Sequence, residues 1–173
     1  MKGGQELEHL AAKAAKGDEE SFVALCDAVK TNLFRAAIGI LGDEGLALDA
    51  VSEAIFKAYK GIRRLKQPQY VLTWFTRIVI NTAKDIHKKQ KREVAQEIDI
   101  NAAVGVDDYS DMYFNELIDG LPLELREIIS LKYYSGFTVA EVATILKLPA
   151  GTVKSRLNRA LKQLRLEALK GYE

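Results

Sequence analysis

Four polar residues near the C-terminus have the types and the spacing needed to contact DNA bases. Ser155, Asn158, Arg159 and Lys162 recur at intervals of three and four, so on a helix they project from one side. In a major groove, Arg159 or Lys154 can donate to O6 and N7 of guanine, and Asn158 can pair with N6 and N7 of adenine. This pattern predicts direct contact with base pairs.

The same predicted helix has residues suited to phosphate contacts and an apolar side that anchors it. Thr152 and Arg156 suit phosphate contacts, which position a helix without specifying sequence. The residues expected to face inward are Val153, Leu157, Ala160, Leu161 and Leu164. Upstream, Thr138 to Glu141 match a capping box, and Lys147 to Pro149 separate the two helices. Together these features predict a basic helix-turn-helix within residues 121–169.

Charge alternates in blocks along the 173 residues, although the net charge is only +1. Residues 57–92 hold eleven Lys or Arg against one acidic residue, a net charge of +10. Residues 128–173 hold eight against three, a net charge of +5. Residues 1–56 and 93–127 are acidic, with net charges of −5 and −9. Basic blocks of this size need an acidic partner, and nucleic acid is the obvious candidate.

Helical periodicity dominates the chain, and few prolines and glycines interrupt it, so we predict an all-α fold. Asp18 is a predicted helix cap, and Gly42 to Gly45 end the helix that it starts. Residues 61–70 are predicted to form a basic loop. The helix that begins at Val71 is apolar at its start and basic at its end, and Leu121-Pro122 is predicted to start another.

Between residues 93 and 112 the periodicity is lost and acidic residues dominate, which predicts a flexible linker. The alternative is a short helix packed on either domain. The predicted architecture is two small helical domains, residues 1–92 and 113–173, joined by this acidic linker. Trp74 could stack on an unpaired base, but its register with Ile78 favours a place in the core.

The residue types needed for catalysis or metal binding are not arranged in any known motif. His9 and His87 are isolated and are expected to be solvated, and the single Cys26 is expected to be a small apolar residue. We therefore expect no enzymatic activity, no cofactor, no metal and no small-molecule substrate. The polar start and the lack of a long uncharged run predict a soluble cytoplasmic protein.

The C-terminal motifs resemble region 4 of the extracytoplasmic-function (group IV) sigma factors of bacterial RNA polymerase. The resemblance lies in Leu121-Pro-Leu-Glu-Leu-Arg126, Leu131-Lys-Tyr-Tyr-Ser-Gly-Phe137, Glu141-Val-Ala143 and Gly151-Thr-Val-Lys-Ser-Arg156-Leu-Asn-Arg159-Ala160. Some response-regulator output domains share a weaker version of these motifs. The resemblance implies that this segment binds the −35 element through Thr152, Lys154, Ser155, Arg156, Asn158, Arg159 and Lys162.

The N-terminal half resembles region 2 of the same sigma factors. The segment from Ala47 to Tyr59 is similar to region 2.2, whose acidic helical face docks on a coiled coil of the polymerase β′ subunit. The implied polymerase-binding residues are Asp49, Ser52, Glu53 and Phe56. Leu48 stands where the family commonly has an acidic residue, and Ser52 where it commonly has Gln, so the contact rests on Asp49 and Glu53.

Thr73 to Ile78, Asn81, Asp85 and the basic run after them are similar to regions 2.3 and 2.4, which open and bind the −10 element. The implied −10 residues are Arg63, Lys66, Tyr70, Arg77, Asn81, Lys84 and Lys88. In the family the loop at 65–70 helps to capture a flipped base, although here it lacks the usual Gly-Asp-Ser character. The implied partners are promoter DNA and core RNA polymerase, through its β′ coiled coil and β flap. An anti-sigma factor, often membrane-anchored in the family, is a further expected partner.

Two other functions compete with an alternative sigma factor. A helix-turn-helix repressor would bind a palindromic operator as a homodimer, but it leaves Asp49, Glu53 and the first basic block without a role. A protein-interaction module would bind acidic partners through its basic faces and show no DNA sequence preference. Polymerase binding and promoter-dependent transcription discriminate among the three.

Overall fold

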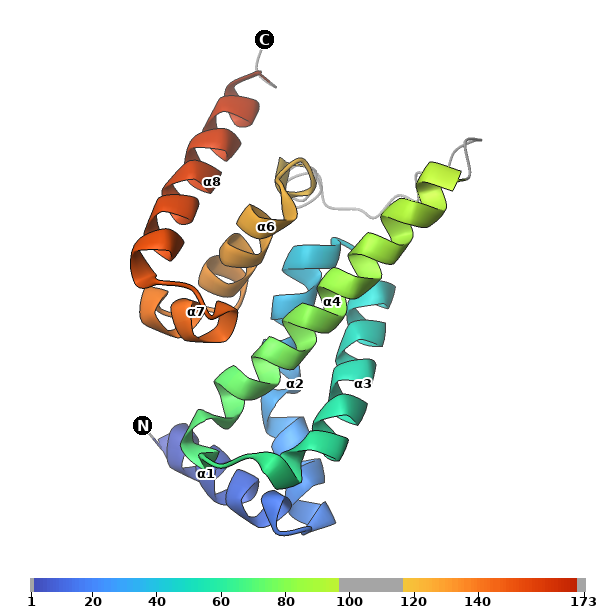
Figure 1. Cartoon of the computed structure of the whole chain (residues 1–173), viewed down its shortest axis with the longest axis vertical. Coiled ribbons are helices and arrows are strands. Elements are labelled where there is room, and N and C mark those ends of the chain that lie inside the picture. Colours follow the sequence, from blue (N-terminus) through green and yellow to red (C-terminus); the bar gives the residue numbers. More distant parts are fainter. Residues whose placement is uncertain (1, 97–116, 171–173) are drawn as a thin grey trace.

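The computed structural model describes residues 2–96 and 117–170, and the regular elements of these residues are all helical (Figure 1). The predicted all-α class is therefore confirmed. The residues between 97 and 116, which hold most of the predicted acidic linker, lie outside the described part of the chain. The helices form two groups, α1 to α4 and α6 to α8, which lie side by side (Figure 1).

The first group comprises α1 (Lys2–Ala15), α2 (Glu19–Leu41), α3 (Glu44–Gly61) and α4 (Val71–Gln96). Helices α2, α3 and α4 pack on one another, and α1 packs across α2 at one end of the group. Asp18 caps α2 as predicted, because its carboxylate accepts a hydrogen bond from the Ser21 amide at 3.0 Å. Gly42 ends α2 with a φ of 67°, a left-handed conformation that glycine adopts without steric cost.

Two boundaries in this group differ from the prediction. The segment predicted as a basic loop holds two single-turn 3-10 helices, η1 (Ile62–Arg64) and η2 (Pro68–Tyr70). Ile62 anchors η1 in the core, and Pro68 begins η2 because its fixed φ suits a first helical turn. Helix α4 continues to Gln96, four residues beyond the predicted end of the domain at residue 92.

The second group comprises α6 (Leu123–Ile129), the π-helical turn η3 (Ser130–Tyr134), α7 (Val139–Leu146) and α8 (Ala150–Lys170). Helix α6 begins just after the predicted Leu121-Pro122 start, with Pro122 flanking its first turn. The predicted capping box is confirmed: Thr138 accepts from the Glu141 amide, and the Glu141 carboxylate accepts from the Thr138 amide. Lys147, at φ 55°, makes the left-handed turn toward α8.

A single apolar core extends across both groups. Ala36, Ala37 and Ile40 of α2 belong to the same buried cluster as Leu131 of η3 and Ile145 of α7. A smaller cluster lies between α6 and α8, and it is built from Ile118, Leu121, Leu125, Ile129 and Ala160. Helix α8 is therefore anchored on α6, while α6 and α7 pack against α2 and α4.

One expected core residue is exposed, and a second is only half-buried. Leu161 was expected to face inward, yet it is exposed, because it is rotated by about 100° from the buried Ala160 beside it. Trp74 is half-buried and packs against the core as predicted, but the fully buried aromatic residue at this end of α4 is its neighbour Phe75.

Candidate nucleic-acid interface

Helix α8 presents a polar face to solvent and holds its opposite face in the core. Val153 and Ala160 are buried, and Leu157 and Leu164 are half-buried against α6. The predicted reading residues Lys154, Ser155, Asn158, Arg159 and Lys162 are all exposed. Their side chains leave the helix from the side that the core does not use, so a DNA groove can reach them.

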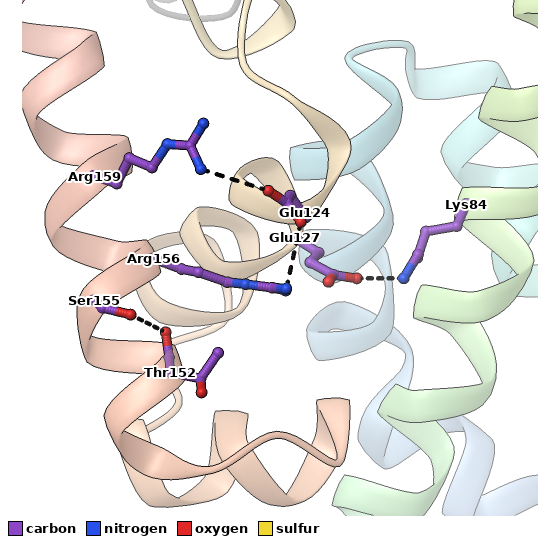
Figure 2. Close-up of polar contacts among 7 residues, drawn as sticks. All are labelled: Lys84, Glu124, Glu127, Thr152, Ser155, Arg156 and Arg159. Atoms are coloured by element: carbon purple, nitrogen blue, oxygen red, sulfur yellow. Dashed lines mark hydrogen bonds and ion pairs between the residues drawn. The ribbon is translucent and has the colours of Figure 1, made fainter.

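One carboxylate lies between two of the arginines on α8. Glu124 of α6 approaches Arg156 at 3.3 Å and Arg159 at 3.9 Å (Figure 2). Arg156 is half-buried and lies toward α6, whereas Arg159 is exposed. Ion pairs this accessible contribute little stability, so DNA can displace Glu124 from Arg159 at small cost. Near the start of α8, the Ser155 hydroxyl donates a hydrogen bond to the carbonyl of Thr152 at 3.0 Å (Figure 2).

A second basic surface surrounds a hollow at the start of α4. The hollow has a volume of about 540 Å³, and Lys66, Tyr70, Trp74 and Arg77 are among its lining residues. Arg63, Lys66 and Tyr70, all predicted −10 residues, are exposed. The indole of Trp74 forms one wall, with the Phe75 ring centroid 5.8 Å from its own and Gly61 beneath it. An aromatic wall beside cations suits an unstacked base.

The other four predicted −10 residues continue along α4. Asn81 and Lys88 are exposed. Arg77 and Lys84 are half-buried, and both are bound to the second group of helices. Arg77 donates to the carbonyls of Thr144 and Ile145, the latter at 2.8 Å. Lys84 donates to Glu127 at 2.6 Å (Figure 2).

An acidic and apolar stripe lies on α3. Asp49, Ser52, Glu53 and Phe56, the predicted polymerase-binding residues, are all exposed, and Phe56 is 58% exposed. Lys60 covers part of the Phe56 ring, with its Nζ 4.0 Å from the ring centroid. Leu48 is also exposed beside them. Large apolar side chains gathered beside carboxylates on a solvent face indicate a protein-binding surface.

Sequence reasoning missed three residues that organise these surfaces: Glu124, Glu127 and Arg126. All three lie in α6, where the sequence analysis assigns a helix start and a family motif but no contact to these side chains. Arg126 is 3% exposed and Glu127 is also buried. Burial lowers the pKa of the Arg126 guanidinium, although the neighbouring Asp119 opposes that shift. The sequence offers one signal for these contacts: the adjacent charged residues Arg126 and Glu127 interrupt a run of apolar residues, which indicates that they meet polar partners.

Cys26 and His87 are both half-buried, and burial shifts the pKa of each. Burial raises the pKa of the Cys26 thiol to about 11, so the thiol stays protonated at neutral pH. His87, expected to be solvated, is half-buried, and burial together with the charges of Arg126 and Lys91 lowers its pKa. Within residues 2–96 and 117–170, His, Cys, Asp and Glu do not cluster as a metal site would require.

A helix-turn-helix beside a second basic helical domain indicates a protein with two DNA-binding surfaces. Residues 25–93 match the family model for sigma-70 region 2, and residues 111–164 match that for sigma-70 region 4. The RNA polymerase sigma factor SigV of Bacillus subtilis is 32% identical over 144 residues, 82% of this chain and 87% of that one. SigW, an ECF RNA polymerase sigma factor of the same bacterium, is 27% identical over 87% of this chain and 90% of its own.

The chain therefore belongs to the sigma-70 family of RNA polymerase sigma factors, in its extracytoplasmic-function group. It acts with core RNA polymerase to direct transcription initiation at promoters. Sigma factors as a class are not enzymes.

Solved structures show the same fold. CnrH, solved with the cytosolic domain of CnrY, superimposes with a TM-score of 0.76 at 23% identity, covering 97% of this chain and 99% of that one. The sigma factor RpoE of Bartonella quintana, solved with the anti-sigma factor NepR, gives a TM-score of 0.68 at 26% identity, covering 88% of this chain and 96% of its own. In the described part of this chain, the helices are too polar or too short to cross a membrane.

Proposed function

We propose that this sigma factor binds the −35 element through α8 and the −10 element through α4 and the two short helices before it. The observation that carries the proposal is the geometry of α8, where one face is anchored on α6 and the other exposes cations and amides at helical spacing. The proposed domains are residues 1–92 and 113–173, with 93–112 as the linker, whose first four residues continue α4.

Each side chain of α8 has a proposed part in −35 binding. Lys154 and Arg159 donate to guanine, and Asn158 pairs with adenine. Thr152 and Arg156 bind phosphate, which fixes the helix in the groove. Ser155 and Lys162 are the remaining contacts on this face.

At the −10 element, the hollow lined by Tyr70 and Trp74 receives an unstacked base. Lys66 lines the hollow, whereas Arg63 lies near Gly17 outside it; both are exposed and so accessible to phosphate. The contacts continue along α4 through Arg77, Asn81, Lys84 and Lys88. The net charge of +10 over residues 57–92 supports this assignment, because phosphate contacts dominate the affinity of proteins for DNA.

The α3 stripe of Asp49, Ser52, Glu53 and Phe56 is the proposed docking site for the β′ coiled coil of the polymerase, and the C-terminal domain is proposed to contact the β flap. The relative RpoE was solved with an anti-sigma factor, which supports an equivalent regulator here. The protein is proposed to work in the cytoplasm without catalytic activity of its own, and a membrane-anchored anti-sigma factor would hold it at the membrane.

Replacing Arg159 by alanine is expected to weaken binding to a promoter with a matched −35 element by about 1–3 kcal/mol, because a bidentate contact to one base is lost. The measurement is transcription by core polymerase reconstituted with the full chain, on promoters with and without the −35 element. These promoters are first obtained by run-off transcription of genomic fragments.

Arg156→Ala is the matched comparison, because it removes a proposed phosphate contact from the same helix. Its loss should be similar across −35 sequences, whereas the loss with Arg159→Ala should be confined to the matched element. Equal losses for Arg159→Ala on both kinds of promoter would rule out direct reading of the −35 bases by this residue.

A further inference from the structure

A small cavity lies at one end of the first group of helices, where α1, the start of α2 and the end of α3 meet (Figure 1). Its volume is about 240 Å³, which is less than the roughly 300–1,000 Å³ of pockets that hold drug-sized ligands. The cavity therefore suits a single planar ring system. It shares no lining residue with the hollow beside Trp74, and of its lining residues only Arg63 has a part in the proposed promoter contacts.

The lining of this cavity is partly apolar and aromatic. Ala14, Phe22 and Ile62 contribute buried side chains to it. The Tyr59 ring is packed edge-to-face with Phe22, with the ring centroids 5.3 Å apart and an angle of 67° between the planes. Tyr59 is 48% exposed, so part of its ring remains open to a ligand. Exposed aromatic rings of this kind are the surfaces on which unpaired bases stack.

A carboxylate supplies a hydrogen-bond acceptor at the rim of the cavity. Glu19 accepts from the Tyr59 hydroxyl at 3.0 Å through Oε1, and Oε2 remains available to a ligand. The hydrogen bond to Glu19 and its negative charge raise the pKa of Tyr59, so the tyrosine keeps its proton and the carboxylate stays the acceptor. The neighbouring Asp18 is already occupied as the cap of α2, where it accepts from the Ser21 amide. Glu19 is therefore the carboxylate that can bind donors of a ligand.

An arginine supplies donors at the same rim. The guanidinium of Arg63 lies beside Gly17, with Nη2 3.5 Å from the position that a Cβ would take there. Lys60 also lines the cavity, but its Nζ lies over the Phe56 ring, 4.0 Å from the centroid, so Arg63 is the better placed donor. A ligand of either charge meets a like charge at this rim, which opposes its binding. A neutral planar group with one donor edge and one acceptor edge fits the arrangement.

We propose that this cavity binds a guanine base. Guanine has adjacent N1–H and N2–H donors that can pair with the Glu19 carboxylate, and its O6 and N7 can accept from Arg63. Adenine and cytosine carry an acceptor nitrogen beside the amino group, and thymine has one N–H between two carbonyls, so each would set an acceptor against the carboxylate. The base can belong to a single DNA strand or to a free guanine nucleotide, because the cavity has room for the base alone. The inference goes beyond the proposed function, which includes no site for a defined base at this end of the molecule.

The full chain is tested with two kinds of probe. One is a short labelled oligothymidine with a central guanine or a central adenine, measured by fluorescence anisotropy, and the other is free GMP or AMP, measured by isothermal titration calorimetry. We expect guanine to bind about tenfold more tightly than adenine in at least one of the two, which is the discrimination that one bidentate pair gives. A preference in the oligonucleotide alone assigns the site to a single strand, whereas a preference for free GMP assigns it to a guanine nucleotide.

Glu19→Gln tests the carboxylate, because the amide keeps the size of the side chain but replaces one acceptor oxygen by a donor. It should abolish the preference for guanine and leave the affinity for plain oligothymidine unchanged. Glu20→Gln is the matched control, since this neighbouring acid lies outside the lining of the cavity and should keep the preference. Both glutamates are exposed, so both variants should fold.

Tyr59→Ala removes the proposed stacking ring and should weaken the binding of guanine about tenfold. Tyr133→Ala, at a tyrosine of similar exposure on η3, should leave it unchanged. Equal affinities for guanine and adenine with both kinds of probe would overturn the proposal. A preference for guanine that survives in Glu19→Gln would also overturn it, because the preference would then arise at another site. The −35 assignment is judged separately by Arg159→Ala and stands or falls without this cavity.

Discussion

Replacing both Asp49 and Glu53 by lysine is expected to abolish stable association with core RNA polymerase. The proposed docking surface on α3 is an acidic and apolar stripe, and reversal of two charges would place like charges against the partner. Removing one partner of a hydrogen-bonded charge pair that is buried in an interface costs about 2–5 kcal/mol, and juxtaposed like charges add to that cost. The measurement is the dissociation constant of the complex with purified core polymerase, together with co-purification from cells.

The variant should keep its fold, because both carboxylates are exposed and Glu53 makes only a surface ion pair with Lys57 at 2.7 Å. Glu6→Lys/Glu8→Lys on α1 is the matched control, since it changes the net charge by the same amount at exposed positions away from α3. The control should bind polymerase normally. Undiminished binding by the α3 variant would refute the assignment of this stripe.

Phe75→Ala is expected to lower the free energy of unfolding by about 3–5 kcal/mol, the usual cost of truncating a buried aromatic residue. Phe75 is completely buried at the start of α4 and belongs to the core that joins α2, α3 and α4. The loss comprises the transfer free energy of the ring and the cavity that remains. Guanidinium unfolding of the full chain, followed by circular dichroism, measures it.

Tyr70→Ala removes an aromatic ring from the neighbouring η2 helix, where the side chain is 54% exposed. Its effect on the free energy of unfolding should stay within about 0.5 kcal/mol, as for most surface substitutions. The same variant should weaken −10 binding, because Tyr70 lines the proposed base site. If Phe75→Ala and Tyr70→Ala lowered the free energy of unfolding by similar amounts, the difference in burial between the two side chains would not explain their contributions to stability.

The sequence predicted those parts of the fold that depend on short-range rules. The caps at Asp18 and Thr138, the glycine end of α2 and the polar face of α8 follow from residues within a few positions of one another. The family resemblance located both basic surfaces, and the comparisons confirm the family and the helical class. The roles of individual residues at the two promoter elements stay predictions.

The contacts between the two groups of helices were not predictable from one sequence, because the hydrogen bonds of Arg77, Arg126 and Ser130 across them join residues 67–94 positions apart. Helical periodicity shows that Arg126 and Glu127 interrupt an apolar stripe, but it does not show which partner they meet. Trp74 and Phe75 illustrate the same limit. Adjacent aromatic residues differ by about 100° around a helix, and only the packing of α4 determines which one is buried.

The core that α2 shares with η3 and α7 links the melting of the two domains. Ala36, Ala37 and Ile40 are covered by Leu131 and Ile145 from the other half of the chain, so neither half is fully shielded from water alone. The two groups of helices should therefore lose structure on heating as one cooperative unit. Separating them would leave two units of lower thermal stability, each with an apolar face exposed. A partner protein that covered these faces would protect them from aggregation.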